Sequence, residues 1–143
     1  MLIARAAFRR LCRARDMLTA ISGEDAPPIR AVARDVRISP FHFIRQFEAL
    51  FGTTPHQFRI GSRLDAAKLL LAAGTMTVTE VCMQVGFSSL GTFSDLFARR
   101  VGEAPSRYRR RLRAMPASFP GCFGLMGGLP ADAFRNFREA RAR

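Results

Sequence analysis

The sequence has little that would support a disulfide framework, a metal centre or a membrane span. Cys12, Cys82 and Cys122 lie far apart and none belongs to a CxxC pair, which argues against disulfides and zinc and favours reduced thiols. The longest wholly apolar run covers only residues 69–73, far fewer than the roughly 20 needed to cross a bilayer. Arginines interrupt the N-terminal segment, so no signal peptide is expected. We therefore expect a cytoplasmic protein without metal, cofactor or membrane anchor.

Strand patterns and acidic residues are also scarce. No stretch sustains the alternation of apolar and polar residues that is typical of a strand. Asp and Glu number 11 against 23 Lys and Arg, which leaves a net charge of +12. A charge of that sign and size favours a polyanionic partner, either nucleic acid or an anionic membrane surface. Lys68 is the only lysine, and the arginine bias reflects either phosphate and guanine recognition or GC-rich coding.

One pattern occurs twice, about fifty residues apart. VARDVRIS at residues 32–39 matches VCMQVGFS at residues 81–88. Each copy is followed by a Phe, a Gly-x-x-Pro sequence and an aromatic residue before Arg, with one extra residue before the Phe of the second copy. A repeat of this kind indicates one supersecondary unit used twice. The pattern predicts a unit of two helices joined by a tight turn.

Capping residues, Gly and Pro divide the chain into helices. Ser39-Pro40 and Thr54-Pro55 combine an N-cap residue with a proline suited to the first helical position, and Thr77 with Glu80 predicts a capping box. We expect helices over about residues 2–21, 29–36, 40–50, 55–73 and 78–85, another from Ser88 or Ser89 to about 101, and a last one over about 105–112. Residues 113–143 are broken by Gly and Pro and predict an irregular apolar and basic tail, with a short helix over about 131–142.

The repeat carries the residues that a helix-turn-helix requires. Such a motif needs a small residue where its helices cross, a turn that permits left-handed backbone, and apolar residues that lock the two helices together. The first copy supplies Ala33, Val36, Ile38 and Phe47, and the second supplies Cys82, Val85, Gly86, Phe87 and Phe97. The second helix of each copy would then present its outer face to a major groove.

The arrangement closely resembles the DNA-binding domain of the AraC/XylS family of bacterial transcription regulators, over about residues 14–110. The most specific stretch is VCMQVGFSSLGTFSDLFARRVGEAPSRYR, supported by SPFHFIRQFEALFGTTPHQF and RLDAAKLLL. The resemblance implies an all-α domain over residues 1–112. Two homeodomain-like helix-turn-helix subdomains, about 14–53 and 77–112, are joined by a linker helix of about 55–73. It also implies a regulator that reads consecutive major-groove segments of double-stranded DNA and that contacts RNA polymerase if it is an activator. The sequence does not give the oligomeric state, for which we favour a monomer.

The resemblance also indicates which residues face the bases. In the family, the base-reading positions fall on Phe41, Ile44, Arg45, Leu90, Gly91, Thr92 and Asp95 of this chain. Arg45 would bind guanine through two hydrogen bonds, or contact phosphate alone. Phe41 and Ile44 would press on thymine methyl groups, or lie partly in the core. His42 is either a backbone contact or a solvent-facing side chain.

Phosphate contacts are expected at helix starts and at arginines near them, because the free N–H groups of a helix N-terminus attract anions. The candidates are Arg37, Ser39, Thr54, Arg59, Ser88, Ser89, Arg99, Arg100, Arg107 and Arg109. Each of these arginines is as readily explained as a solvated surface residue.

Three departures from the family pattern affect the interpretation. Arg37 stands where the first turn usually has Gly, so a left-handed backbone there would cost about 1 kcal/mol or more; the turn is altered, or Arg37 gains a phosphate contact. Asp95 stands where a cation is common, so the second unit is expected mainly to position the protein. Few residues precede the resemblance, so we expect a stand-alone DNA-binding member.

Other functions are less well supported by the residues. An architectural binder without sequence preference fits the charge and the weak hydrogen-bonding capacity of the second recognition helix. Alkyl-transfer catalysis would need an activated thiol, and Cys122 lacks flanking His and Arg residues. Membrane association through the tail is disfavoured by its Gly and Pro breaks. The tail would either cover apolar surface on the last helices or serve in sensing or dimerisation.

Overall fold

The computed structural model describes residues 4–20 and 26–115, which form helices without a strand. These helices are α1 (Arg5–Thr19), α2 (Ile29–Asp35), α3 (Pro40–Phe51), α4 (Pro55–Ala73), α5 (Val78–Gln84), α6 (Leu90–Val101) and α7 (Pro105–Ala114). The predicted all-α fold is confirmed. Helix α7 continues two residues past the predicted end at 112, and the remainder of the tail, with its predicted helix, lies outside the described residues.

The helix boundaries follow the capping residues. The Thr54 and Thr77 hydroxyls accept the backbone N–H groups of Gln57 and Glu80, whose side chains accept in return. These are two complete capping boxes, and the bond from the Thr77 N–H lowers the pKa of Glu80. Ser39 occupies the N-cap position of α3, but its hydroxyl does not cap the backbone and instead bonds His42 Nδ1 at 2.8 Å. The predicted capping role of its side chain is therefore wrong.

Two separate cores hold the helices together. The first-unit core consists of Leu11, Ala14, Leu18, Val32, Ala33, Val36, Phe43 and Phe47. The second-unit core consists of Leu64, Ala67, Leu71, Val81, Cys82, Val85, Phe93, Phe97 and Tyr108. All the helix-turn-helix packing residues predicted from the repeat are buried or, for Ile38 and Phe87, half-buried against these cores. The repeated sequence pattern is thus a repeated packing pattern.

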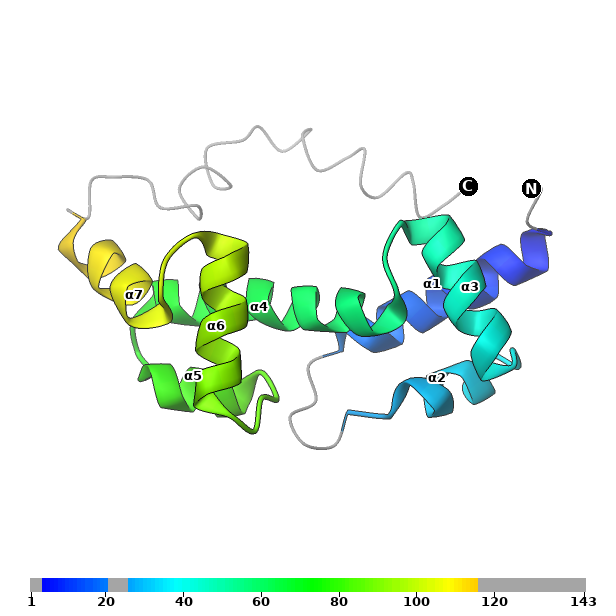
Figure 1. The fold of residues 1–143 in the computed structure, drawn as a ribbon, viewed down its shortest axis with the longest axis horizontal. Coiled ribbons are helices and arrows are strands. Elements are labelled where there is room, and N and C mark those ends of the chain that lie inside the picture. The colour runs from blue at the N-terminus through cyan, green and yellow to red at the C-terminus, as the bar shows by residue number, and fades with distance from the viewer. Residues whose placement is uncertain (1–3, 21–25, 116–143) are drawn as a thin grey trace.

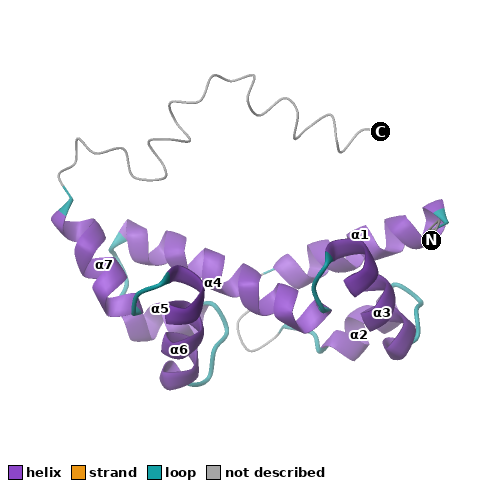
Figure 2. Cartoon of the chain, turned by 45° about the horizontal axis from the view of Figure 1, so that its top comes forward, coloured by secondary structure: helices purple, strands orange, loops and turns teal. Residues whose placement is uncertain are grey.

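Helix α4 belongs to both units. Near its start Phe58 packs against Phe47, with ring centroids 5.6 Å apart, and further along its buried residues enter the second-unit core. The molecule is consequently elongated, with α3 in one unit and α6 in the other along the length of α4 (Figures 1 and 2). A helix of 19 residues is about 28 Å long, which is comparable to one turn of DNA, about 34 Å.

Two arginines one turn apart on α4 bind the backbone of different units. Arg59 Nη2 donates to the Pro27 carbonyl at 2.6 Å, just before α2. Arg63 Nη1 donates to the Gly86 carbonyl at 3.0 Å, in the turn between α5 and α6. Partial burial lowers the pKa of both guanidinium groups, and the charge of Arg63 lowers the pKa of Arg59 further. These bonds tie the linker helix to both helix-turn-helix units.

An ion pair makes a further connection to α6. Arg100 donates to both carboxylate oxygens of Asp65, at 3.1 and 2.9 Å. Its guanidinium lies over Gly61, where an added Cβ would come within 3.3 Å of Arg100 Nη1. Gly61 has no side chain that would block this approach. In the structure it makes room for an arginine side chain from α6.

We expect Arg63→Met to lower the free energy of unfolding by about 1–2 kcal/mol, because the Gly86 carbonyl loses a charged donor while the side chain keeps most of its length. Arg99→Met is the matched control, since Arg99 is exposed and makes no hydrogen bond or ion pair within residues 4–20 and 26–115. Urea unfolding of both variants measures the difference. Equal stabilities of the two variants would show that the Arg63 bond contributes nothing.

Candidate nucleic-acid interface

The outer face of α3 exposes large apolar side chains. Phe41 is 64% exposed and Ile44 is 40% exposed, whereas Phe43 and Phe47 on the inner face are fully buried. Neither Phe41 nor Ile44 is therefore part of the core, which removes the alternative left open by the sequence. Apolar groups held at the surface of a helix can contact thymine methyl groups in a major groove.

Arg45 is held against the same face. Its guanidinium carbon lies 5.6 Å from the centroid of the Phe41 ring, a cation–π contact typically worth about 0.5–1 kcal/mol at an exposed site. The His42 and Phe41 rings pack edge to face, with their centroids 5.8 Å apart, and His42 Nδ1 is hydrogen-bonded to the Ser39 hydroxyl. The guanidinium of Arg45 therefore lies against the exposed Phe41 ring on this face of α3.

The corresponding face of α6 has different chemistry. Leu90 is 43% exposed, and Gly91, Thr92 and Asp95 are also exposed. The Thr92 N–H donates to the Ser89 hydroxyl at 3.3 Å, so Ser89 is the residue that caps this helix. Asp95 makes no ion pair among the described residues. This face presents a leucine, a hydroxyl and a carboxylate where α3 presents two apolar groups and a guanidinium.

The two turns have the same left-handed backbone and the same hydrogen bonds, although the first turn has Arg37 where the second has Gly86. Arg37 has φ +56° and Gly86 has φ +91°. In both turns the next residue donates to a carbonyl five residues earlier at 3.0 Å, Ile38 to Ala33 and Phe87 to Cys82. An altered first turn, one of two possibilities suggested by the sequence, is therefore wrong. Arg37 adopts the left-handed conformation and bears its steric cost.

We expect Arg37→Gly to raise the free energy of unfolding by about 0.5–1 kcal/mol, because relief of the left-handed strain exceeds the added chain entropy of glycine. Gly86→Ala is the converse control and should destabilise the protein by about 1 kcal/mol or more. Thermal unfolding of the two variants measures both effects. A less stable Arg37→Gly variant would contradict the assignment of strain.

Four of the exposed phosphate candidates have side chains without a partner. Arg37, Ser88, Arg99 and Arg107 lie at the surface, and none of their side chains makes a hydrogen bond or ion pair among the described residues. They are free to contact an anion, and a phosphate role for them stays a prediction.

The other candidates have partners within the protein. Arg59 and Arg100 bind Pro27 and Asp65 as described above, and Arg109 Nη2 donates to the Gly74 carbonyl at 3.4 Å while its buried Nε has no partner. The hydroxyls of Ser39, Thr54 and Ser89 bond residues of their own helices. A phosphate contact by these arginines would compete with, or add to, a structural bond.

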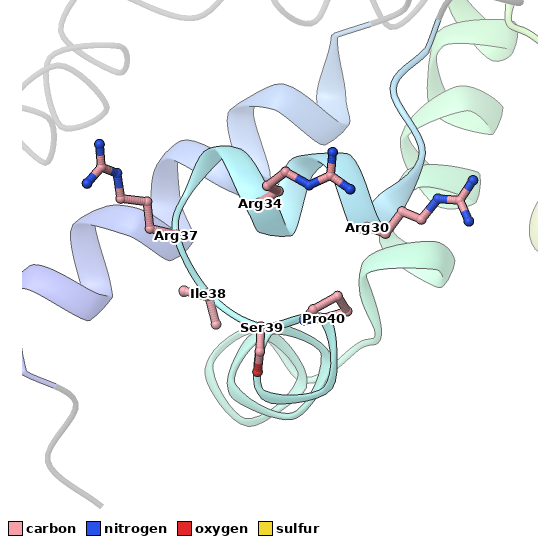
Figure 3. Close-up of a pocket in the computed structure, with 6 residues that line it drawn as sticks. All are labelled: Arg30, Arg34, Arg37, Ile38, Ser39 and Pro40. Carbon is pink, nitrogen blue, oxygen red and sulfur yellow. The ribbon is translucent and has the colours of Figure 1, made fainter.

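A pocket of about 400 Å³ lies between α2 and the start of α3 (Figure 3). It is lined by Arg30, Arg34, Arg37, Ile38, Ser39 and Pro40. In Figure 3 the side chains of Arg30 and Arg34 extend to the same side, and that of Arg37 extends to the other. Arg30 and Arg34 were not identified from the sequence, although their spacing of four residues places them on one face of α2.

Among the described residues, Cys82 shows no sign of activation. Cys82 is buried in the second-unit core with Sγ 3.7 Å from the Phe87 carbonyl, and burial raises the pKa of its thiol. Cys12 is free, and Cys122 lies outside the described residues. Within residues 4–20 and 26–115, no cluster of His, Cys, Asp or Glu could hold a metal ion. In the same residues, no helix combines the length and apolar character required to cross a bilayer.

Comparison with known proteins adds to this geometry. Residues 32–111 match a family described as a helix-turn-helix domain. The probable transcriptional regulator LumQ of Photobacterium leiognathi is 43% identical over 72 residues, which cover 48% of this chain and 29% of LumQ. The chain therefore spans less than a third of the length of this curated relative.

Solved structures share the fold. A transcriptional regulator from Chromobacterium violaceum, described as AraC-type, superimposes with a TM-score of 0.69 at 23% identity, covering 82% of this chain and all of that structure. The DNA-binding domain of AdpA, a global transcriptional factor solved in complex with a target DNA, superimposes with a TM-score of 0.63 at 28% identity. That match covers 75% of this chain and 92% of the AdpA domain.

Proposed function

Because the chain belongs to the AraC-type family of helix-turn-helix transcription regulators, we propose that it binds duplex DNA by placing α3 and α6 in consecutive major-groove segments. The observation that carries this proposal is the exposed face of α3, where Arg45 stacks on Phe41 beside Ile44. Folding of the domain does not require large apolar side chains and an arginine on the exposed face of α3. Recognition of base edges does require such side chains, because they contact the bases directly.

The two recognition helices contribute unequally in this proposal. Arg45 binds guanine O6 and N7, and Phe41 and Ile44 contact thymine methyl groups. On α6, Thr92 is the only hydroxyl among the proposed base readers, and Asp95 accepts from a cytosine amino group. Leu90 and Gly91 give α6 no further hydrogen-bonding side chain, so sequence specificity is concentrated in the first unit. His42 supports the α3 face through its contacts with Ser39 and Phe41.

Membership of the family supports a wider role, which we propose as follows. Residues 1–112 form the DNA-binding domain, with units of about 14–53 and 77–112 joined by the linker, and the protein works as a monomer on chromosomal DNA in the cytoplasm. If it activates transcription, it contacts RNA polymerase from its DNA site. Arg37, Ser88, Arg99 and Arg107 are its simplest phosphate contacts, since they have no partner among the described residues.

Competition with random DNA tests the proposal. Binding to a selected site should persist in excess random DNA, because specific sites typically bind about 10³- to 10⁷-fold more tightly than non-specific DNA. An architectural protein would lose the labelled site in proportion to the competitor added. Loss in that proportion would replace sequence-specific regulation with the architectural alternative.

A further inference from the structure

Three arginines form a row along α2 and the following turn. Arg30 and Arg34 are about one helical turn apart on α2, so they lie on one side of that helix, and Arg37 follows in the left-handed turn. All three are exposed and line the pocket in front of α3. Among residues 4–20 and 26–115 none of their side chains makes a hydrogen bond or ion pair. Three guanidinium groups therefore line one pocket, and Asp35, the acidic residue next to Arg34, forms no ion pair with them.

The second unit lacks this row. At the places in the repeat that correspond to Arg30, Arg34 and Arg37 it has Thr79, Met83 and Gly86. The two units otherwise share their packing residues and their turn hydrogen bonds. The folding of a helix-turn-helix therefore does not require arginine at these positions. At Arg37 the side chain is even unfavourable, because the backbone there is left-handed.

The arrangement fits an extended anion better than a compact one. In Figure 3 the Arg30 and Arg34 side chains extend to the same side and Arg37 extends to the other, so the three guanidinium groups do not converge on a single point. Arg30 and Arg34 are about 6 Å apart along the helix axis. A nucleic-acid strand presents a series of phosphate charges, with which all three groups can pair. The same pocket is lined by Ser39, the N-cap residue of α3, so the three arginines lie next to the start of this helix and beside the DNA that it would contact.

We propose that Arg30, Arg34 and Arg37 form a phosphate clamp that binds successive phosphates of one DNA strand beside the groove segment read by α3. The clamp rests on the proposed function and extends it: the first unit has a set of phosphate contacts, beside its base-reading helix, that the second unit lacks. The clamp gives a reason for an arginine at position 37 in the left-handed turn, because a phosphate contact by Arg37 offsets the backbone strain when DNA is bound. The second unit depends on other contacts.

Salt dependence of DNA binding tests the clamp. Each phosphate neutralised contributes about 0.9 to the slope of log affinity against log salt. The triple variant Arg30→Gln, Arg34→Gln, Arg37→Gln should therefore lower the slope by about 2–3, with the same preferred sequence as the parent protein. The control variant Arg5→Gln, Arg9→Gln, Arg13→Gln removes the same charge from three exposed arginines of α1 and should lower the slope by much less. Equal changes in the two triple variants would overturn the clamp.

Two further readouts separate the possible failures. If the parent protein shows no sequence preference, the proposed function fails, but the slopes on random DNA still report on the clamp. If inorganic phosphate, at matched ionic strength, inhibits the parent protein more than the triple variant, the pocket is a small-anion site and the clamp is wrong. Equal inhibition supports the clamp. Circular dichroism melting confirms that both triple variants fold, as expected for exposed residues.

Discussion

We expect Phe47→Ala to lower the free energy of unfolding by about 3–5 kcal/mol. Phe47 is fully buried at the centre of an aromatic cluster, with ring centroids 5.6 Å from Phe43, 4.5 Å from Phe51 and 5.6 Å from Phe58. These partners come from α3 and from the start of α4, so the ring joins the recognition helix to the linker. Because small domains are stable by only about 5–15 kcal/mol, most of the stability of the first unit would be lost.

The matched control lies on the same helix. Phe41→Ala removes the same atoms from a side chain that is 64% exposed, so it should change the free energy of unfolding by about 0.5 kcal/mol or less. Urea unfolding followed by far-ultraviolet circular dichroism measures both variants. If the two variants were destabilised equally, the assignment of Phe47 to the core and Phe41 to the surface would be wrong.

The second large effect concerns base recognition. We compare the preferred site with a site in which another base replaces the contacted guanine. Arg45→Ala should reduce the discrimination between these two sites by about 1–3 kcal/mol, roughly 5- to 150-fold. Thr92→Ala, at the corresponding face of α6, should cost less discrimination because a hydroxyl makes a weaker and less selective contact. Affinities for the two sites, measured at one salt concentration, give the difference for each variant. Equal losses from Arg45→Ala and Thr92→Ala would contradict the unequal roles of the two helices.

Arg45→Lys separates the two possible contacts of Arg45. Lysine keeps the charge but lacks the planar fork that binds guanine through two hydrogen bonds. If Arg45 reads guanine, Arg45→Lys should lose most of the discrimination while retaining much of the overall affinity. If Arg45 contacts only phosphate, Arg45→Lys should discriminate as well as the parent protein, and the proposed base contact would be wrong.

The helices could be predicted because their ends are encoded locally. Thr54, Thr77 and Gly74 act on backbone groups within a few residues of themselves, so their effect can be recognised without knowledge of the fold. The cores were predictable for a related reason, since the apolar residues recur at the same places in both copies. Ser39 shows the limit of this reasoning: a good N-cap residue bonds the side chain of His42 instead of the backbone.

The bonds across the fold were not predictable from the sequence. Arg59 was expected to contact phosphate, yet it donates to Pro27, which is distant along the chain and adjacent only after folding. The same holds for Arg63 with Gly86 and for Arg100 with Asp65. In a chain so rich in arginine, sequence position alone does not distinguish an arginine that binds the protein from one that is free to bind DNA. The structure makes that distinction by the carbonyls and carboxylates within reach.

Selection of bound DNA from random sequence is the most direct test of the central claim, that two helix-turn-helix units of unequal chemistry read consecutive segments of one duplex. We expect an enriched site with two boxes about one helical turn apart, the box read by α3 being the more strongly conserved among selected sequences. Arg45→Ala should weaken that box and leave the other unchanged. Recovery of sequences with no shared motif, or of two boxes with equal information, would contradict the account.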